Sequence, residues 1–230
     1  MSMTFAGSMA TLTLIRGAQL VASPWKNGGG VTREVAAFPA DAGLDTFVWR
    51  VSVADVAQAG PFSRFAGIDR TLVLLSGAGM LLDEAQSGEA VATHALTQAF
   101  DTARFAGEAH IDARLVDGPT RDFNLMVRRD RAQAELDVWH TTQQQAPGER
   151  TLSADVALLY CASGAIAVAL GDAQADSQAD SQAQRLEPGD TLRIDAPNNL
   201  SCRIKGEGAL LAIRIRYTQP ATQPAAASIR

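Results

Sequence analysis

Short apolar runs with a two-residue period dominate this sequence and constrain its fold more than any other feature. Residues 47–53 (FVWRVSV) and 123–129 (FNLMVRR) place apolar side chains at every second position, as a strand with one buried face does. The runs are bounded by Gly, Pro, Asp and Ser, and helical periodicity is hard to find. Many short strands with frequent turns form a sandwich or a barrel, so we expect an all-β protein. Further strands are expected at 71–82, 156–170, 190–195 and 209–217.

The second half of the chain repeats features of the first half. Residues 72–82 resemble residues 157–170, each reading as a strand, a turn of small residues and another strand. Residues 104–129 likewise parallel residues 185–216, which favours a duplicated β unit with a boundary in the polar region 130–150. We therefore predict an N-terminal unit at 11–130, a degenerate C-terminal unit at 131–217, a flexible loop at 172–184 and a disordered tail at 218–230.

Charge and composition exclude several classes of partner. The 230 residues carry a formal net charge of -5, which does not favour nucleic acid or an anionic membrane. No uncharged apolar run approaches the length of a membrane span, and the first Arg follows the N-terminal apolar stretch, unlike in a secretory signal. Cys161 and Cys202 are too few for a disulfide framework. We expect a cytoplasmic protein without nucleic-acid or membrane partners.

Metal and nucleophile motifs are missing from the sequence. His94, His110 and His140 are scattered singly, and Cys161 and Cys202 do not form a C-x-x-C pair. No G-x-S-x-G segment is present. We expect no metal and no other cofactor, and no residue is assigned a catalytic role.

The stretch PWKNGGGVTRE (24–34) is the most unusual in the chain. It is not a phosphate-binding P-loop, because Lys26 precedes the glycines instead of following them. A glycine run allows close approach of the backbone, either to a ligand or to another strand at a tight turn. The residues by themselves leave both interpretations open.

Several polar residues fall in strands that should contribute to the core. Arg50 and Ser52 lie in one such strand and Asn124 in another, while Arg70 directly precedes a third. Inward Arg residues imply a polar cavity or buried ion pairs, because an unpaired buried charge is costly. Guanidinium groups bind carboxylates with two hydrogen bonds, so a cavity would suit a small organic anion. The alternative is that these strand faces are solvated. The cationic candidates are Lys26, Arg33, Arg50, Arg64 and Arg70.

Three blocks, at 24–36, 47–82 and 115–129, resemble the HutD/Ves family of bacterial cupin-like proteins in order and spacing. The resemblance implies a bicupin, that is, two packed cupin-like (RmlC-like) β-barrels in one chain. The positions of the usual cupin metal ligands hold no histidine here. The family pattern marks Trp25, Lys26, Asn27, Gly28, Gly29, Thr32, Arg33, Glu34, Trp49, Arg50, Ser52, Pro61, Phe62, Ser63, Asp69, Arg70, Gly118, Asp122, Asn124, Met126 and Arg128.

The resemblance also implies a link to histidine utilisation, in which urocanate and formylated glutamate are intermediates. We expect a metal-free protein that binds a small carboxylate metabolite and has a regulatory role, rather than an enzyme. A metal-independent isomerase or hydrolase with Glu34 or Asp69 as base, and a stress-linked interaction module, are the alternatives; a homodimer through an edge strand is compatible with each. The predicted ligand-binding residues are Trp25, Lys26, Asn27, Gly28, Gly29, Thr32, Arg33, Glu34, Arg50, Ser52, Phe62, Ser63, Arg64, Asp69, Arg70, Asn124 and Met126.

Overall fold

A computed structural model describes residues 2–4, 10–86, 89–143, 148–171 and 183–218. Three antiparallel sheets account for nearly all of these residues, and the one helical element is a 3-10 turn, η1 (Gly17–Gln19). The prediction of an all-β protein is confirmed. No helix in the described part of the chain has the length and apolar character needed to cross a membrane.

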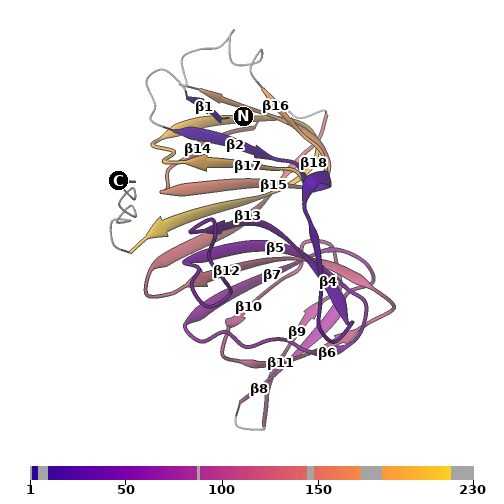
Figure 1. The fold of residues 1–230 in the computed structure, drawn as a ribbon. Coiled ribbons are helices and arrows are strands. Elements are labelled where there is room, and N and C mark those ends of the chain that lie inside the picture. The colour runs from indigo at the N-terminus through magenta and orange to yellow at the C-terminus, as the bar shows by residue number, and fades with distance from the viewer. Residues whose placement is uncertain (1, 5–9, 87–88, 144–147, 172–182, 219–230) are drawn as a thin grey trace.

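Residues 22–128 form two facing sheets, which we call the N-terminal sandwich (Figure 1). The first sheet has six strands in the order β10-β7-β12-β5-β4-β3, and the second has four in the order β6-β11-β8-β9. The six strands are β3 (Ala22–Pro24), β4 (Gly30–Phe38), β5 (Trp49–Val56), β7 (Ile68–Ser76), β10 (Thr102–Ala106) and β12 (Thr120–Arg128). The four strands are β6 (Gly60–Pro61), β8 (Met80–Gln86), β9 (Glu89–Leu96) and β11 (His110–Leu115).

The third sheet has eight strands and contains the C-terminal half together with the start of the chain. Its main path is β1-β2-β17-β15-β18-β13, while β14 pairs with β18 and β16 with β15. Its strands are β1 (Ser2–Thr4), β2 (Thr11–Ile15), β13 (Ala132–Thr141), β14 (Gly148–Leu152), β15 (Val156–Gly171), β16 (Gln184–Leu186), β17 (Thr191–Asp195) and β18 (Leu200–Tyr217).

The sheets differ from the sequence-based expectation in two places. β2 pairs with β17, so the strand at 11–15 joins the C-terminal strands although it was placed in the N-terminal unit. Residues 156–170 were expected to form two strands, but β15 is continuous and pairs with β18 along its length, with only a register shift between Cys161 and Ser163. The expected flexible loop falls mainly on 172–182 and the expected tail on 219–230, which lie outside the described residues.

The six-stranded sheet is the middle layer, and its two faces have different partners (Figure 1). Its outer face, including Trp49, Val51 and Phe123, packs against the eight-stranded sheet. Its inner face, including Leu72 and Leu74, packs against the four-stranded sheet. Because side chains alternate along each strand, every second residue of β5, β7 and β12 points into the N-terminal sandwich.

Candidate functional site

The glycine run forms the turn between β3 and β4. The Trp25 N–H donates to the Gly30 carbonyl at 2.9 Å, and the Gly28 N–H donates to the Trp25 carbonyl at 3.0 Å. Gly28 has φ of +70°, and a Cβ on Gly30 would lie 2.6 Å from the Asp55 carbonyl oxygen. Side chains are therefore excluded by the turn and by the approach of β5. The backbone geometry accounts for the glycines without a ligand.

The side chains of this turn also stabilise it. The Asn27 Oδ1 accepts from the Gly29 N–H at 3.0 Å, and the Trp25 Nε1–H donates to Thr32 Oγ1 at 2.7 Å. Trp25 packs against the core of the N-terminal sandwich, whereas Lys26 is exposed. Of the predicted loop residues, the aromatic ring alone reaches the sandwich interior.

Five polar side chains gather inside the N-terminal sandwich, and we call them the inner polar cluster. They come from three adjacent strands: β5, β12 and β7. The register sets Asn124 opposite Ser52, and it sets Met126 between Arg50 on one side and Arg70 on the other. Four of the five are buried, and the Arg50 side chain is 12% exposed. The inner polar cluster comprises Arg50, Ser52, Arg70, Asp122 and Asn124.

Arg70 is the most enclosed cation of the cluster. Its Cζ lies 5.2, 5.8 and 5.1 Å from the ring centroids of Phe62, Phe65 and Phe105, which is cation–π distance. One hydrogen bond runs from Nη1 to the Ser63 carbonyl at 3.3 Å. Burial lowers the pKa of Arg70 to about 10, so the guanidinium stays charged at neutral pH.

Arg50 lies at the rim of the cluster and already has partners. Its Nε donates to Glu34 Oε2 at 2.7 Å and its Nη1 donates to Ser52 Oγ at 3.2 Å. The charge of Arg50 also contributes to lowering the pKa of Arg70, which places both cations within electrostatic range of each other. An anion between them would interact favourably with both.

The described part of the sandwich interior contains buried polar atoms without a hydrogen-bond partner. They are Arg70 Nε, Asp122 Oδ2, Asn124 Oδ1 and Thr120 Oγ1. A buried polar group without a partner costs roughly 1–3 kcal/mol, so such groups seldom cluster without a function. The unpaired Arg70 donor and the oxygens of β12 belong to side chains on the same face of the six-stranded sheet.

Asp122 has the most perturbed environment of these groups. Burial raises the pKa of Asp122 to about 7, while the positive charge of Arg70 opposes that rise and Asp55 adds to it. Neither Asp122 Oδ2 nor Arg70 Nε has a hydrogen-bond partner among the described residues. Asp122, with its raised pKa, is the one acid among the five side chains of the inner polar cluster, which also holds the cations Arg50 and Arg70.

The structure separates the other predicted cations and acids from this cluster. Arg33 faces the opposite side of the sheet, where it and Arg121 bind Asp55 at 2.5 and 2.6 Å. Asp69 pairs with Arg129 at 2.9 Å on the outer face. Among the predicted residues that do converge are Arg50, Ser52, Arg70 and Asn124, with Glu34, Phe62 and Met126 beside them. Lys26, Ser63 and Arg64 have exposed side chains.

The ligand-binding residues predicted from the sequence do not include Asp122, Phe65 or Phe105, which lie at the inner polar cluster. Asp122 belongs to the family pattern and shares the inward face of β12 with Asn124, so the two-residue period could have included it. Phe105 lies opposite Arg70 in the β10–β7 register, and that pairing between distant segments has no local signal.

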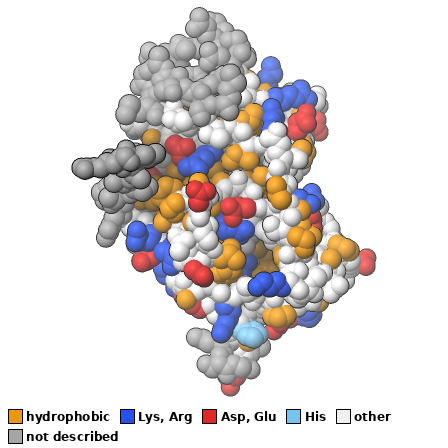
Figure 2. All heavy atoms as spheres, viewed as in Figure 1, with side chains coloured by type: hydrophobic (Ala, Val, Ile, Leu, Met, Phe, Trp, Pro, Cys, Tyr) orange, Lys and Arg blue, Asp and Glu red, His pale blue; other side chains and the backbone are white. Residues whose placement is uncertain are grey.

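Figure 2 shows the surface hollowed over the N-terminal sandwich, with basic and hydrophobic side chains around the hollow.

Metal ligands do not assemble in the described residues, where no group of three His, Cys, Asp or Glu side chains could hold an ion. His94 instead contacts Glu84 at 3.0 Å, and His110 contacts Asp112 at 3.2 Å. The chemistry that the inner polar cluster offers is therefore hydrogen bonding, positive charge and one titratable carboxyl group.

Replacing Asp122 by asparagine is expected to stabilise the protein at high pH. The folded protein holds a proton on Asp122 up to about pH 7, whereas the unfolded chain releases it near pH 3.8. The free energy of unfolding of the wild type therefore falls as the pH rises between those two values. Asp122→Asn should raise the free energy of unfolding by about 2–4 kcal/mol at pH 8, and the gain should shrink toward pH 4. Urea unfolding at several pH values measures it; a gain that does not change with pH would contradict the assignment.

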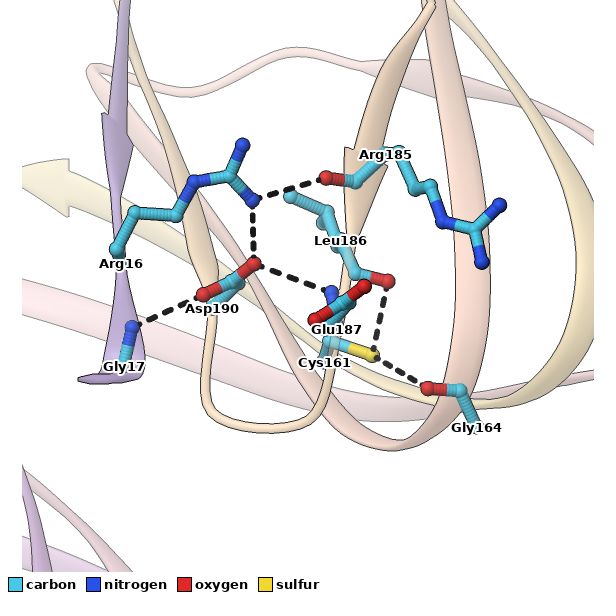
Figure 3. A network of polar contacts seen from close by, with 8 residues as sticks. All are labelled: Arg16, Gly17, Cys161, Gly164, Arg185, Leu186, Glu187 and Asp190. Atoms are coloured by element: carbon cyan, nitrogen blue, oxygen red, sulfur yellow. Dashed lines mark hydrogen bonds and ion pairs between the residues drawn. The ribbon is translucent and has the colours of Figure 1, made fainter.

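A second polar network lies in the C-terminal half (Figure 3). Asp190 is buried and accepts from the Gly17 N–H at 2.9 Å, from the Glu187 N–H at 3.1 Å and from Arg16 Nη1 at 2.6 Å. Burial alone would raise the pKa of Asp190, but these hydrogen bonds and the Arg16 charge lower it overall. The adjacent cavity of about 400 Å³ is lined by both acids and arginines. We interpret the network as structural, because each carboxylate oxygen has a partner.

Removing the Asp190 carboxylate is expected to loosen the start of the chain. A Cβ on Gly17 would lie 2.6 Å from the Gly189 carbonyl carbon, so this segment crosses the β16–β17 turn at close range. Asp190→Ala leaves two backbone N–H groups and Arg16 without their acceptor, and we expect a loss of about 1–3 kcal/mol in the free energy of unfolding. Chemical denaturation measures the loss; Glu187→Ala, which keeps the backbone donor, is the matched control.

Comparison with known proteins gives the same family from sequence and from structure. The model of the HutD family matches residues 5–212. An uncharacterised 21.2 kDa protein of the hutC 3' region of Pseudomonas putida is 35% identical over 185 residues, which cover 80% of this chain and 91% of that protein. The Ves protein of Citrobacter koseri is 38% identical over 115 residues, which cover 50% of this chain and 56% of Ves.

Solved structures extend the likeness to the whole fold. HutD from Pseudomonas fluorescens SBW25, solved in a formate condition, has a TM-score of 0.73 and 28% identity over 90% of this chain and 100% of that chain. A 2-hydroxyethylphosphonate dioxygenase has a TM-score of 0.62 but only 8% identity, over 88% of this chain and 78% of the other. The second likeness shows the fold alone, and that fold is cupin-like.

Proposed function

Because the chain belongs to the HutD family, we propose that it binds a small carboxylate metabolite in its inner polar cluster and thereby regulates histidine utilisation. The observation that carries this proposal is the pair of cations, Arg50 and Arg70, directed into one interior where the buried Arg70 Nε has no partner in the described structure. The P. putida relative, from the 3' region of hutC, supports an association with the hut locus. Urocanate and formylglutamate are the proposed ligands.

The proposed binding mode uses charge and hydrogen bonds and requires no metal. Arg70 would donate to the carboxylate from Nε, Arg50 would approach it from the rim, and Asn124 would contact the rest of the ligand. Phe62 and Met126 would form apolar walls. A guanidinium under aromatic rings has little water around it, which strengthens its attraction for an anion.

We also propose that each half of the chain is one cupin-like barrel, so that the protein is a bicupin. Two observations support this proposal. The eight-stranded sheet, which contains the long strands β15 and β18, encloses its own apolar core. The N-terminal sandwich encloses a second apolar core. In this proposal the N-terminal unit holds the ligand. The C-terminal unit packs against the outer face of the six-stranded sheet and has a structural role.

A thermal-shift screen tests the proposed function. Formate, urocanate, formylglutamate, histidine, glutamate and citrate are added separately, with EDTA and with divalent metals. A ligand at 100 times its dissociation constant stabilises the folded state by about 2.7 kcal/mol, which raises Tm measurably. We expect a carboxylate-dependent shift that is insensitive to EDTA.

Two arginine variants make the screen specific. Arg50→Ala should reduce the shift, whereas Arg64→Ala, which removes an exposed arginine outside the inner polar cluster, should leave it unchanged. A shift that requires metal would contradict the proposed binding mode. No shift with any compound would count against carboxylate binding as a whole.

A metal-independent isomerase or hydrolase is the second candidate, and the environment of Asp122 favours it. A buried carboxyl group with a pKa of about 7 is suited to general acid–base catalysis beside a guanidinium. Glu34 and Asp69, the bases expected from sequence, are instead held in ion pairs with Arg50 and Arg129. Conversion of urocanate or formylglutamate by the wild type and not by Asp122→Asn would establish this candidate.

A further inference from the structure

The carboxyl group of Asp122 faces the same interior as the two cations that would hold an anion. It lies on β12, two residues before Asn124 and on the same face, and its Oδ2 is buried without a partner in the described structure. A ligand carboxylate bound to Arg70 would therefore meet a second carboxylate on the neighbouring strand. Two negative charges this close would repel each other unless one of them is neutralised.

We infer that the inner polar cluster takes up a carboxylate together with one proton, and that Asp122 holds that proton. This inference rests on the proposed function, because it specifies the charge state in which that ligand is bound. The step balances as one anion and one proton from solvent entering, with the Asp122 carboxylate becoming a carboxylic acid. No covalent bond to the ligand forms or breaks.

The charges around Asp122 favour this outcome. From β7, Arg70 is the one nearby cation that stabilises the ionised form, and a ligand would share it. From β5, Asp55 disfavours ionisation, although Asp55 itself pairs with Arg33 and Arg121.

The remaining charged groups near the site are already paired. Arg50 of β5 is paired with Glu34 of β4, and on the facing four-stranded sheet Glu84 of β8 is paired with His94 of β9. An added anion therefore has no further free cation to balance it among these groups.

Protonation of Asp122 also supplies a hydrogen-bond donor for the bound carboxylate. An ionised Asp122 offers only acceptor oxygens toward a ligand carboxylate, which itself only accepts. Two carboxyl groups that share one site hold one proton between them, as in other buried dyads. A protonated Asp122 donates an O–H to the ligand, while Arg70 Nε donates from β7. Both sides of the anion are then satisfied.

Affinity for a carboxylate should consequently depend on pH. Above the pKa of Asp122 in the free protein, each binding event draws a proton from solvent, so affinity falls by up to about tenfold per pH unit. Below that pKa, Asp122 already carries its proton and affinity becomes independent of pH until the ligand itself is protonated. The protein would therefore hold its ligand more tightly as the pH falls toward the pKa of Asp122, and no more tightly below it.

Calorimetric titration with formate at pH 8 tests the inference. The titration is repeated in two buffers with different ionisation enthalpies, because the difference in heat counts the protons taken up. We expect about one proton per bound formate for the wild type. Asp122→Asn should bind formate without proton uptake and with an affinity that does not change between pH 6 and pH 8, roughly bracketing the free pKa.

A control and a second readout separate the outcomes. Asp69→Asn, which removes an acid from the outer face of the same sheet, should keep the proton uptake. Difference infrared spectra with ¹³C-labelled formate should show a new protein carboxylic-acid band in the wild type and not in Asp122→Asn. Formate binding without proton uptake, or uptake that persists in a folded Asp122→Asn, overturns this inference alone; no binding of formate or of the larger carboxylates overturns the proposed function.

Discussion

Replacing Arg70 by methionine is expected to weaken carboxylate binding about 100-fold or more. Removing one partner from a buried, hydrogen-bonded charge pair costs about 2–5 kcal/mol in binding, which corresponds to this range. Arg70 has the largest expected effect because it is buried under Phe62, Phe65 and Phe105 and its Nε has no acceptor within the described protein. Titration calorimetry with the carboxylate that gives the largest thermal shift measures the loss.

Two controls distinguish loss of binding from loss of structure. Arg70→Lys keeps the charge but loses the planar fork, so it should recover only part of the affinity. Arg33→Met removes a cation from the opposite face of the same sheet and should bind as the wild type does. Circular dichroism checks that each variant is folded. A folded Arg70→Met protein with unchanged affinity would move the binding site away from the inner polar cluster.

Replacing Trp49 by alanine is expected to lower the free energy of unfolding by about 3–5 kcal/mol. The Trp49 side chain is fully buried between the six-stranded and eight-stranded sheets. Its ring stacks 6.4 Å from Phe38, its Nε1–H donates to the Tyr217 hydroxyl at 3.2 Å, and Arg193 lies 5.3 Å from its centroid. The substitution thus removes contacts to both halves of the chain at once.

Urea denaturation followed by circular dichroism measures this loss. Trp49→Phe should recover part of the stability, because it keeps the aromatic contact and loses the hydrogen bond to Tyr217. Val21→Ala, at an 80% exposed position, should change the free energy of unfolding by less than about 0.5 kcal/mol. If Trp49→Ala unfolded with the stability of the wild type, the interface between the sheets would contribute little to the fold.

Much of the candidate site could be predicted by local reasoning. Arg50 and Ser52 lie in the β5 segment and Asn124 in the β12 segment, and all three contribute to the cluster as the sequence indicated. The alternation of residues 47–53 also predicted the apolar outer face that includes Trp49 and Val51. These features depend on one strand at a time, so a window of a few residues contains them.

Other predicted residues lie away from the inner polar cluster, because their position depends on the face of the strand to which they belong. Asp69 and Arg70 are neighbours in the chain, yet the first pairs with Arg129 on the outer face and the second enters the cluster. Arg33 and Glu34 also point to opposite faces: Arg33 lies opposite Val53 of the outer face, and Glu34 lies opposite Ser52 of the cluster. A register shift follows between Glu34 and Ala36. Successive residues of a strand point to opposite faces, so a one-residue change reverses the assignment.

The sequence by itself determined the all-β fold, the family and the identity of the polar residues available to a ligand. Only the tertiary structure decided that Arg50 and Arg70 flank Met126, that Asp122 is buried on the same face of the sheet and that the glycine run closes a hairpin. The physical reason is that the two-residue pattern depends on the burial of neighbouring residues, whereas convergence depends on pairing between residues such as Arg50 and Met126, which are 76 positions apart in the chain. Register and sheet packing bring those segments together, and with them the charges that would bind a carboxylate.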